Sequence, residues 1–138
     1  MSDFELDRRL EADTHWVADG PLSQLRLMDD ARFPWLVLVP RVPQAVEWID
    51  LDEFSQQQLW SEVRRACRLL RGEPGCEKLN VGALGNIVRQ LHVHVVARHP
   101  GDDAWPGPVW GSGAAQRLAP DALADRLARL RGAWPAQH

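Results

Sequence analysis

The sequence predicts one α+β domain built on a mostly antiparallel sheet. Three observations lead to this fold class. A chain of 138 residues with 45% hydrophobic and 25% charged residues has the composition of an ordinary globular protein and is long enough for one core. Apolar runs of strand length alternate with turn residues, and two segments repeat apolar residues at helical spacing. The order helix, hairpin, strand, helix, strand, strand, helix fits an α+β sheet with hairpin connections.

The N-terminal third predicts a short helix and a hairpin. Phe4, Leu6 and Leu10 lie in a charged stretch at spacings that suit a short helix. Residues 15–18 and 22–28 read as two strands, and the Asp-Gly-Pro sequence at 19–21 supplies their turn. The Arg-Phe-Pro sequence at 32–34 then interrupts the chain. Residues 35–39 form a continuous apolar run, which predicts a central strand covered on both faces and ended by Pro40.

The clearest helix is predicted over residues 51–70. Asp50 and Glu53 fit a capping pattern at its start, and Gly72 follows its end. Its apolar stripe consists of Leu59, Val63, Ala66, Cys67 and Leu70. Residues 79–83 then read as a short strand, 84–86 as a turn and 87–98 as a second strand.

The remaining residues complete a single domain over 1–138, with its core at about 15–110. Residues 100–113, rich in Pro, Gly and Trp, predict an ordered loop. The leucines at 123, 127 and 130 predict a final helix at about 120–131. Most of the seven Trp residues are expected in the core, because an indole buries a large area. No membrane span or signal peptide is visible, so we expect a cytoplasmic protein that does not bind membranes. The net charge of −3 argues against nucleic-acid binding.

Chemistry is indicated by the sequence Gln-Leu-His-Val-His-Val-Val-Ala-Arg at 90–98. Successive side chains on a strand point to opposite faces, so Gln90, His92 and His94 are expected to share one face. Leu91, Val93 and Val95 would take the other face. Polar groups roughly 6–7 Å apart along a rigid strand would form a suitable floor for an active site.

A metal site is the first alternative. The His-x-His spacing of His92 and His94 also occurs in zinc sites, which need at least one further ligand. His15, His99, Cys67 and Cys76 are possible ligands, but none has a recognisable ligand spacing. We therefore expect no metal and no cofactor.

Several segments together resemble the histidine-triad (HIT) superfamily over roughly residues 15–110. They are the sequence Pro-Trp-Leu-Val-Leu-Val-Pro-Arg at 34–41, Asn-Val-Gly at 80–82, Gly-Asn at 85–86 and Gln-Leu-His-Val-His-Val at 90–95. The family motif is His-φ-His-φ-His-φ-φ, in which φ is apolar. Here Gln90 replaces the first histidine, while His92 and His94 hold the second and third places.

The resemblance implies a five-stranded sheet with a long helix packed on it, and a homodimer that joins two sheets into one of ten strands. It also implies a nucleotide hydrolase or nucleotidyl transferase in which His92 attacks the α-phosphorus and forms a covalent nucleotidyl-histidine. His94 would donate beside the α-phosphate. Asn80 and Asn86 would lie near the ribose and phosphates, and Trp105 would approach the site of the partner subunit. Dinucleoside polyphosphates, nucleoside phosphoramidates and acyl-adenylates all offer the required α-phosphorus.

The residue chemistry is compatible with these roles and leaves two questions open. A neutral imidazole is a competent nucleophile near pH 7, and fixed N–H donors stabilise the charge of a phosphoryl transition state. Arg98 could be such a donor or could pair with Asp102 or Asp103. Gln90 can form hydrogen bonds but cannot relay a proton at neutral pH. The alternative function is therefore a nucleotide-binding or sensor module without catalysis.

Overall fold

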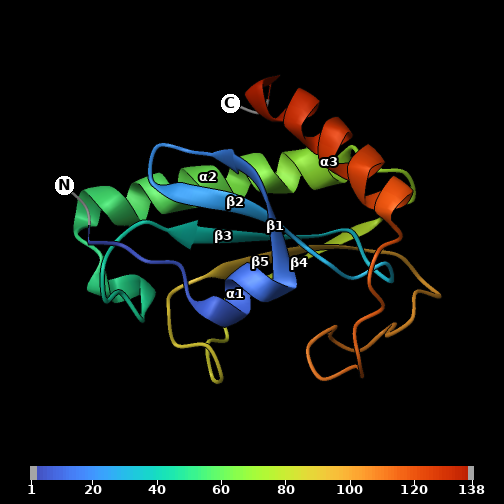
Figure 1. The fold of residues 1–138 in the computed structure, drawn as a ribbon, viewed down its shortest axis with the longest axis horizontal. Helices are drawn as coiled ribbons and strands as arrows, with labels where there is room; N and C mark the ends of the chain where they lie inside the picture. Colours follow the sequence, from blue (N-terminus) through green and yellow to red (C-terminus); the bar gives the residue numbers. More distant parts are fainter. Residues whose placement is uncertain (1–2, 137–138) are drawn as a thin grey trace.

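The computed structural model describes residues 3–136. The elements follow the chain in the order helix, hairpin, strand, helix, two strands and helix (Figure 1). Their bounds are α1 (Arg8–Asp13), β1 (Thr14–Asp19), β2 (Ser23–Met28), β3 (Trp35–Pro40), a 3-10 turn η1 (Trp48–Asp50), α2 (Glu53–Arg71), β4 (Lys78–Gly82), β5 (Val93–Arg98), α3 (Pro120–Ala133) and a second 3-10 turn η2 (Trp134–Ala136).

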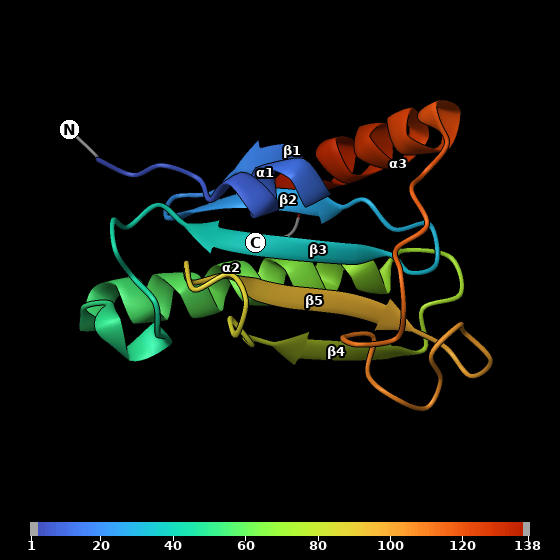
Figure 2. The same ribbon diagram turned by 60° about the horizontal axis from the view of Figure 1, so that its bottom comes forward.

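One five-stranded sheet in the order β1-β2-β3-β5-β4 forms the centre of the fold, and every neighbouring pair is antiparallel. This confirms the predicted α+β class and the predicted hairpin. Figure 2 shows the sheet face-on, with α2 behind it and α1 and the chain between β4 and β5 in front. β3 and β5 occupy central positions, and every residue of both strands is buried. The sheet therefore has two covered faces in its middle, and its edge strands β1 and β4 each have one strand neighbour.

The two faces carry two separate apolar clusters, because side chains alternate along each strand. On the α2 side, Leu36, Leu38 and the odd-numbered residues of β5 join the stripe of α2. On the opposite side, Trp35, Val37 and Val96 join the other cluster. The stripe predicted for α2 is confirmed, since Leu59, Val63, Ala66 and Leu70 are buried and Cys67 packs beside them. The leucines predicted for the final helix also pack on this core.

The β1–β2 hairpin is fastened to α2 by a buried carboxylate. Glu62 accepts hydrogen bonds from the backbone N–H groups of Leu22 (2.8 Å) and Ser23 (3.1 Å). Gly20 in the turn leaves room for this contact, because a Cβ there would lie 2.3 Å from Glu62 Oε2 and the carboxylate would have to shift. The turn residues therefore specify both the hairpin and its attachment to the helix.

Two predicted helix starts are wrong. The N-terminal helix begins only at Arg8, and Phe4 and Leu6 precede it in a non-helical segment that packs on the cluster around Trp35. The cap of α2 is Asp52, whose carboxylate accepts from Ser55 N at 2.7 Å. Asp50 instead accepts from the backbone N–H groups of residues 46 and 47 and closes the preceding 3-10 turn.

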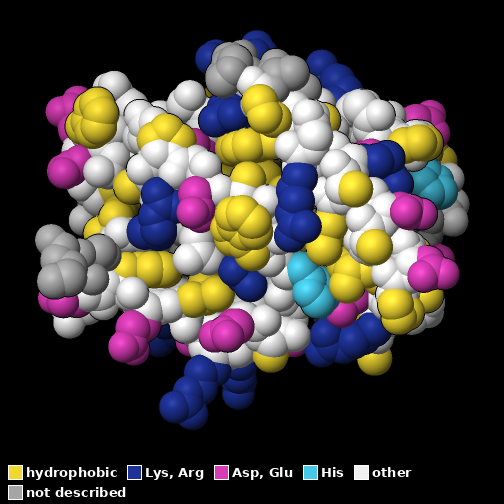
Figure 3. All heavy atoms as spheres, turned by 45° about the horizontal axis from the view of Figure 1, so that its top comes forward, with side chains coloured by type: hydrophobic (Ala, Val, Ile, Leu, Met, Phe, Trp, Pro, Cys, Tyr) yellow, Lys and Arg dark blue, Asp and Glu magenta, His cyan; other side chains and the backbone are white. Residues whose placement is uncertain are grey.

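The expectation that most tryptophans are core residues is also wrong. Trp35 and Trp134 are buried and Trp110 is partly buried, whereas the other four, Trp16, Trp48, Trp60 and Trp105, are exposed. On the face drawn in Figure 3, basic and acidic side chains are interspersed with apolar ones. Across residues 3–136, no helix combines the length and apolar character that crossing a membrane requires.

Candidate active site

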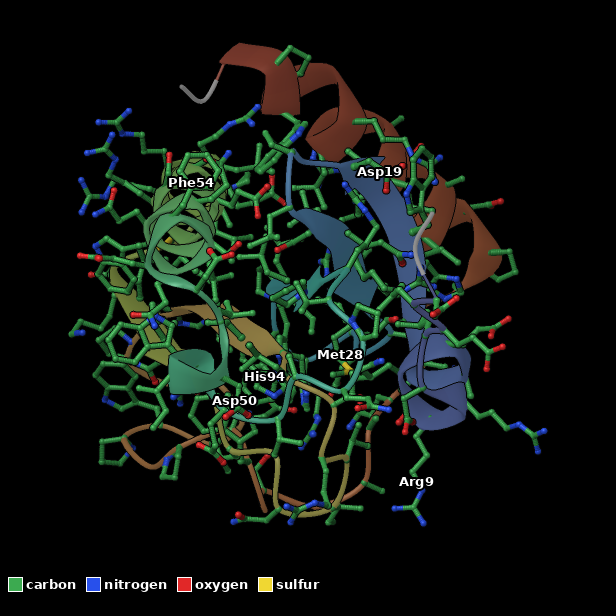
Figure 4. All side chains as sticks on the ribbon, turned by 90° about the vertical axis from the view of Figure 1, so that its left-hand side faces the viewer. Arg9, Asp19, Met28, Asp50, Phe54 and His94 are labelled. Atoms are coloured by element: carbon green, nitrogen blue, oxygen red, sulfur yellow. The ribbon has the colours of Figure 1, made fainter. Side chains whose placement is uncertain are left out.

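A pocket of about 590 Å³ opens on the sheet face opposite α2. Its floor includes Trp35, His92 and His94, and its walls come from the chain at 28–32, 84–88 and 109–117. In Figure 4, which views the molecule from the left-hand side of Figure 1, His94 and Met28 lie near the middle of the view and Arg9 points outward. The volume lies within the range of small-molecule sites, roughly 300–1,000 Å³.

The predicted histidine strand is shorter than expected. β5 begins at Val93, so Gln90 and His92 lie in the irregular segment that leads into it. The predicted alternation nevertheless holds for the histidines: His92 and His94 both border the pocket, whereas Leu91, Val93 and Val95 belong to the cluster on the α2 side. Because both rings are only 5–6% exposed, the pocket is their route to a ligand.

His92 is oriented by the backbone of the residue at the first triad position. Its Nδ1 lies 2.6 Å from the carbonyl oxygen of Gln90. Since a carbonyl can only accept, Nδ1 must carry the proton, and the lone pair of the neutral ring is then on Nε2. Nε2 makes no hydrogen bond to any other residue within 3–136. His92 thus has the tautomer that a nucleophile requires.

His94 has the opposite tautomer. The indole Nε1–H of Trp35 donates to His94 Nδ1 at 3.0 Å, and an indole N–H cannot accept. The proton of neutral His94 is therefore on Nε2. Burial, and secondarily the neighbouring His92, lowers the pKa of His94 from 6.5 to about 3. The ring is consequently neutral at physiological pH.

The two rings place a nucleophile and a donor side by side. Their centroids are 4.8 Å apart, with an interplanar angle of 72°. In the neutral forms, the His92 ring offers a lone pair on Nε2 and the His94 ring offers an N–H group on Nε2. This pair is suited to attack on an electrophilic centre whose oxygen atoms gain negative charge.

The side chain of Gln90 points to the N-terminal segment and does not border the pocket. Its Oε1 accepts from Asp7 N at 2.8 Å, and its Nε2 donates to Glu5 O at 2.8 Å. The same residue that orients His92 through its backbone thereby anchors residues 5–7 through its side chain.

Of the other predicted site residues, only Asn86 borders the pocket. Asn80, Arg98 and Trp105 gather at the far end of β5, where Arg98 is 1% exposed. Arg98 donates to both carboxylate oxygens of Asp102 at 2.7 and 2.9 Å and to Asn80 Oδ1 at 2.8 Å. Its guanidinium carbon lies 5.6 Å from the centroid of the Trp105 ring. Of the two possibilities for Arg98, the structure has the ion pair with Asp102.

Two aromatic residues of the pocket were not predicted as site residues. Trp35 is the partner of His94, and Trp110 packs on His94 with ring centroids 5.4 Å apart. Trp110 lies over Gly82, where a Cβ would approach its ring to 3.2 Å. A signal for Trp35 existed, because a buried indole needs an acceptor and a neighbouring strand carried two imidazoles.

The pocket wall opposite the histidines is built from paired charges that no sequence pattern indicated. Asp30 binds Arg32 through both carboxylate oxygens, at 2.8 and 3.0 Å. Asp29 accepts from Arg117 at 3.1 Å and from Leu118 N at 2.8 Å, and lies 2.9 Å from His15 Nε2. Burial by itself would raise the pKa of both carboxyl groups, but these hydrogen bonds lower them below 3.8. This wall holds the chain at 112–118 in place.

Within the described residues, no three His, Cys, Asp or Glu side chains lie close enough to hold a metal ion. His92 and His94 therefore have no third ligand of these types beside them in residues 3–136.

Comparison with known proteins places this geometry in context. Residues 9–101 match the HIT domain. A histidine triad protein from Bradyrhizobium japonicum is 47% identical, with a TM-score of 0.90 over 94% of this chain and 96% of that chain. One from Sinorhizobium meliloti is 45% identical, with a TM-score of 0.91 and the same coverage, 94% and 96%. One from Marinobacter aquaeolei is 38% identical, with a TM-score of 0.93 over 98% of both chains. No curated protein matches the chain.

Proposed function

The chain belongs to the HIT family, and we propose that it is a nucleotide-binding phosphohydrolase or nucleotidyl transferase. The reaction takes place at the α-phosphorus of a nucleoside phosphate derivative and proceeds through a covalent nucleotidyl-histidine on His92. The observation that carries this proposal is the pair of opposite tautomers, with the His92 lone pair and the His94 N–H on the same pocket.

Each residue has a defined part in the proposed reaction. His92 Nε2 attacks phosphorus, while the Gln90 carbonyl stabilises the growing positive charge on the ring by accepting from Nδ1–H. His94 Nε2–H donates to a non-bridging phosphate oxygen, which gains charge in the transition state. Gln90 is a positioning residue, because only its backbone faces His92.

Substrate contacts are proposed for the residues that border the pocket. Asn86 lies on its rim with an amide that can bind phosphate or ribose oxygens. Asn80, Arg98 and Trp105 have their polar and aromatic groups engaged with one another and with Asp102, so we assign them to the support of the pocket's outer loop.

We also propose that the protein is a homodimer joined through the open edge at β4. This strand has a neighbour on one side only. Beside it an apolar groove of about 480 Å³ is lined by the exposed side chains of Trp48, Trp60 and Val81. Trp110 does not contribute to this groove, because it packs on His94 in the pocket of its own subunit. Sedimentation at micromolar protein that gave only a 15.6 kDa species would contradict the dimer.

The covalent step is tested by mass spectrometry. Wild-type protein is mixed with diadenosine tetraphosphate or acetyl-adenylate, quenched in base and weighed, because phosphohistidine linkages are labile in acid. An added adenylyl group that maps to the peptide containing His92, and that is missing in His92→Ala, is the expected result. The His99→Ala protein is the matched control, since His99 is exposed on the same segment. Turnover by wild type with equal turnover by His92→Ala would overturn the proposal.

A nucleotide sensor without catalysis is the second candidate, favoured by the first triad position, whose side chain binds residues 5–7 and not the pocket. The two functions share a binding step. AMP or GMP at a hundredfold excess over its dissociation constant should stabilise the fold by about 2.7 kcal/mol. A thermal shift with AMP together with no turnover and no adduct would establish the sensor.

A further inference from the structure

We propose that Trp35 makes this site selective for acidic leaving groups, so that its substrates are anhydrides of a nucleoside α-phosphate. The inference rests on the proposed function and decides between the substrate classes that the sequence leaves open. A phosphate or carboxylate oxygen leaves the α-phosphorus as a stable anion, whereas the nitrogen of a phosphoramidate needs a proton. Trp35 acts through His94 and is therefore a positioning residue.

The contact between Trp35 and His94 is fixed by the sheet. β3 pairs with β5 so that Val37 lies opposite His94 and Trp35 opposite Val96. Trp35 is thus the diagonal neighbour of His94 on the same face, within reach of a long side chain. Its ring is 7% exposed and is packed edge-on against Phe33 (6.3 Å) and Trp110 (6.5 Å). The indole N–H has little freedom to turn away from His94 Nδ1.

This contact removes His94 as an acid. To transfer its Nε2 proton as an imidazolium, the ring would first need a second proton on Nδ1, where the Trp35 N–H already points. Transfer from the neutral ring would leave an imidazolate anion in a buried site, which is strongly unfavourable. Burial and His92 oppose the second proton further, as the lowered pKa of His94 shows. His94 can therefore donate a hydrogen bond but not a proton.

No other side chain that borders the pocket in residues 3–136 can act as the general acid in place of His94. The acids Asp13, Asp29 and Asp30 lie on the wall with Arg32 and Arg117 and are paired with these arginines. Guanidinium groups do not release protons at neutral pH, and the chain contains no tyrosine. The departing group must leave without a proton from the protein.

The reaction balances without an acid when the leaving group is an oxyanion. The lone pair of His92 Nε2 forms the N–P bond, and the electron pair of the broken P–O bond departs with the phosphate or carboxylate oxygen. Water then adds to phosphorus, the N–P electron pair returns to Nε2, and the proton of the water passes to solvent. No atom is oxidised or reduced.

The first test measures how the rate depends on the leaving group in the wild-type protein. The 4-nitrophenyl and phenyl esters of AMP differ in leaving-group basicity and little in shape. Without acid assistance, kcat/KM for the nitrophenyl ester should exceed that for the phenyl ester by at least about a hundredfold, the lower end of what general-acid catalysis contributes. Adenosine 5′-phosphoramidate should be cleaved at least about a hundredfold less efficiently than diadenosine tetraphosphate or acetyl-adenylate. Values within about tenfold in both comparisons would overturn the inference.

Diadenosine tetraphosphate has a phosphate leaving group and acetyl-adenylate has a carboxylate leaving group, so the two compounds distinguish these two kinds of anhydride. A preference for either is consistent with the proposal and identifies the second half of the substrate. If the protein cleaved none of these compounds and formed no adduct on His92, the proposed function and this inference would both be overturned. Cleavage of all of them at similar rates would overturn only the inference.

The second test needs no turnover. In protein labelled with ¹⁵N-histidine, His94 should have the Nε2–H tautomer throughout pH 5.5–8. An imidazolium or an Nδ1–H tautomer in that range would contradict the proposal. In Trp35→Phe the tautomer should become mixed, and the ratio between the two aryl esters should narrow by at least about tenfold. Trp134→Phe is the matched control, because Trp134 is equally buried on the other face of the sheet. If Trp35→Phe had mixed His94 tautomers but the same kcat/KM ratio between the nitrophenyl and phenyl esters as wild type, the role of Trp35 would be overturned.

Discussion

The two ends of β5 bear polar side chains on the same face, yet they differ in how those side chains are used. At the start of the strand, His94 and His92 (which directly precedes the strand) each have one ring nitrogen held by the protein and the other on the pocket. At its end, Arg98 gives three of its nitrogens to Asp102 and Asn80. The burial of the three side chains is similar.

The difference teaches that burial alone does not separate chemistry from support. A buried polar group whose hydrogen bonds are all made within the protein stabilises the fold, because breaking the set leaves an unpaired group. A buried group with one open position on a cavity is available to a ligand. The two ends of β5 differ in this respect: each histidine keeps one ring nitrogen free for a ligand, whereas the guanidinium of Arg98 is engaged by Asp102 and Asn80.

The largest effect is expected at the open end. His92→Ala should lower kcat/KM by about 10⁴–10⁶-fold, since removal of a covalent nucleophile abolishes the intermediate. Steady-state kinetics with diadenosine tetraphosphate measures this, together with urea unfolding to show that the fold is kept. His99 is exposed, so His99→Ala should retain wild-type activity. A loss of activity as large as in His92→Ala would show that His92 has no special role in the reaction.

At the closed end, the expected effect is on stability. Arg98→Leu leaves the carboxylate of Asp102 buried without its partner, which should lower the free energy of unfolding by about 3–5 kcal/mol. Urea denaturation gives the value. Arg129→Ala breaks an exposed ion pair with Glu73 and should cost less than about 1 kcal/mol. Equal losses in the two variants would show that burial adds nothing to the Arg98 pair.

His94 should show the behaviour of a donor. His94→Ala should cost about 10²–10³-fold in kcat, or roughly 2.7–4 kcal/mol, as for the loss of one oxyanion donor. His94→Gln supplies an amide N–H and should recover at least tenfold of that loss. Because glutamine cannot act as an acid, a complete absence of recovery would instead favour proton transfer by His94.

Gln90 joins the open end to the N-terminal segment, and its side chain should matter less than its backbone. Gln90→Ala removes two hydrogen bonds to residues 5 and 7, which should lower the free energy of unfolding by about 1–2 kcal/mol and kcat by less than about tenfold. Gln90→His, which restores the full triad, should keep or raise the rate. A loss in Gln90→Ala as large as in His92→Ala would assign the side chain a direct role.

The smallest effect is a pH dependence at the closed end. The Arg98 guanidinium lowers the pKa of Asp102 from 3.8 to about 2. A depressed carboxyl pKa stabilises the fold above pH 3.8, and this contribution is lost as pH falls toward 2. Between pH 6 and pH 3 the lost contribution should be about 1 kcal/mol. Urea unfolding of wild type and Asp102→Asn at both values measures it, and an equal acid sensitivity of the two proteins would contradict the assignment.

Local sequence was sufficient for the elements with strong periodicity. The hairpin around Gly20, the stripe of α2 and the fully covered strand at Trp35–Pro40 follow from patterns of neighbouring residues. The shared side of His92 and His94 also follows from local alternation, although β5 begins at Val93, six residues after the predicted start at residue 87. The start of α2 was misplaced because two nearby acidic side chains could cap it, and the preceding 3-10 turn takes Asp50 and leaves Asp52 as the cap. The start of α1 was misplaced because Phe4 and Leu6 pack on the cluster around Trp35 without being helical.

Polar partners were decided by the tertiary structure. Trp35 is 59 positions from His94, and Gln90 is 83 positions from Asp7. The position of a side chain on one face of a strand is set by the backbone dihedral angles of the strand itself, so sequence alone determined that the histidines point together. The atom that a ring nitrogen or a guanidinium meets is set by how distant segments pack, so only the tertiary structure decided the tautomers of His92 and His94 and the partners of Arg98.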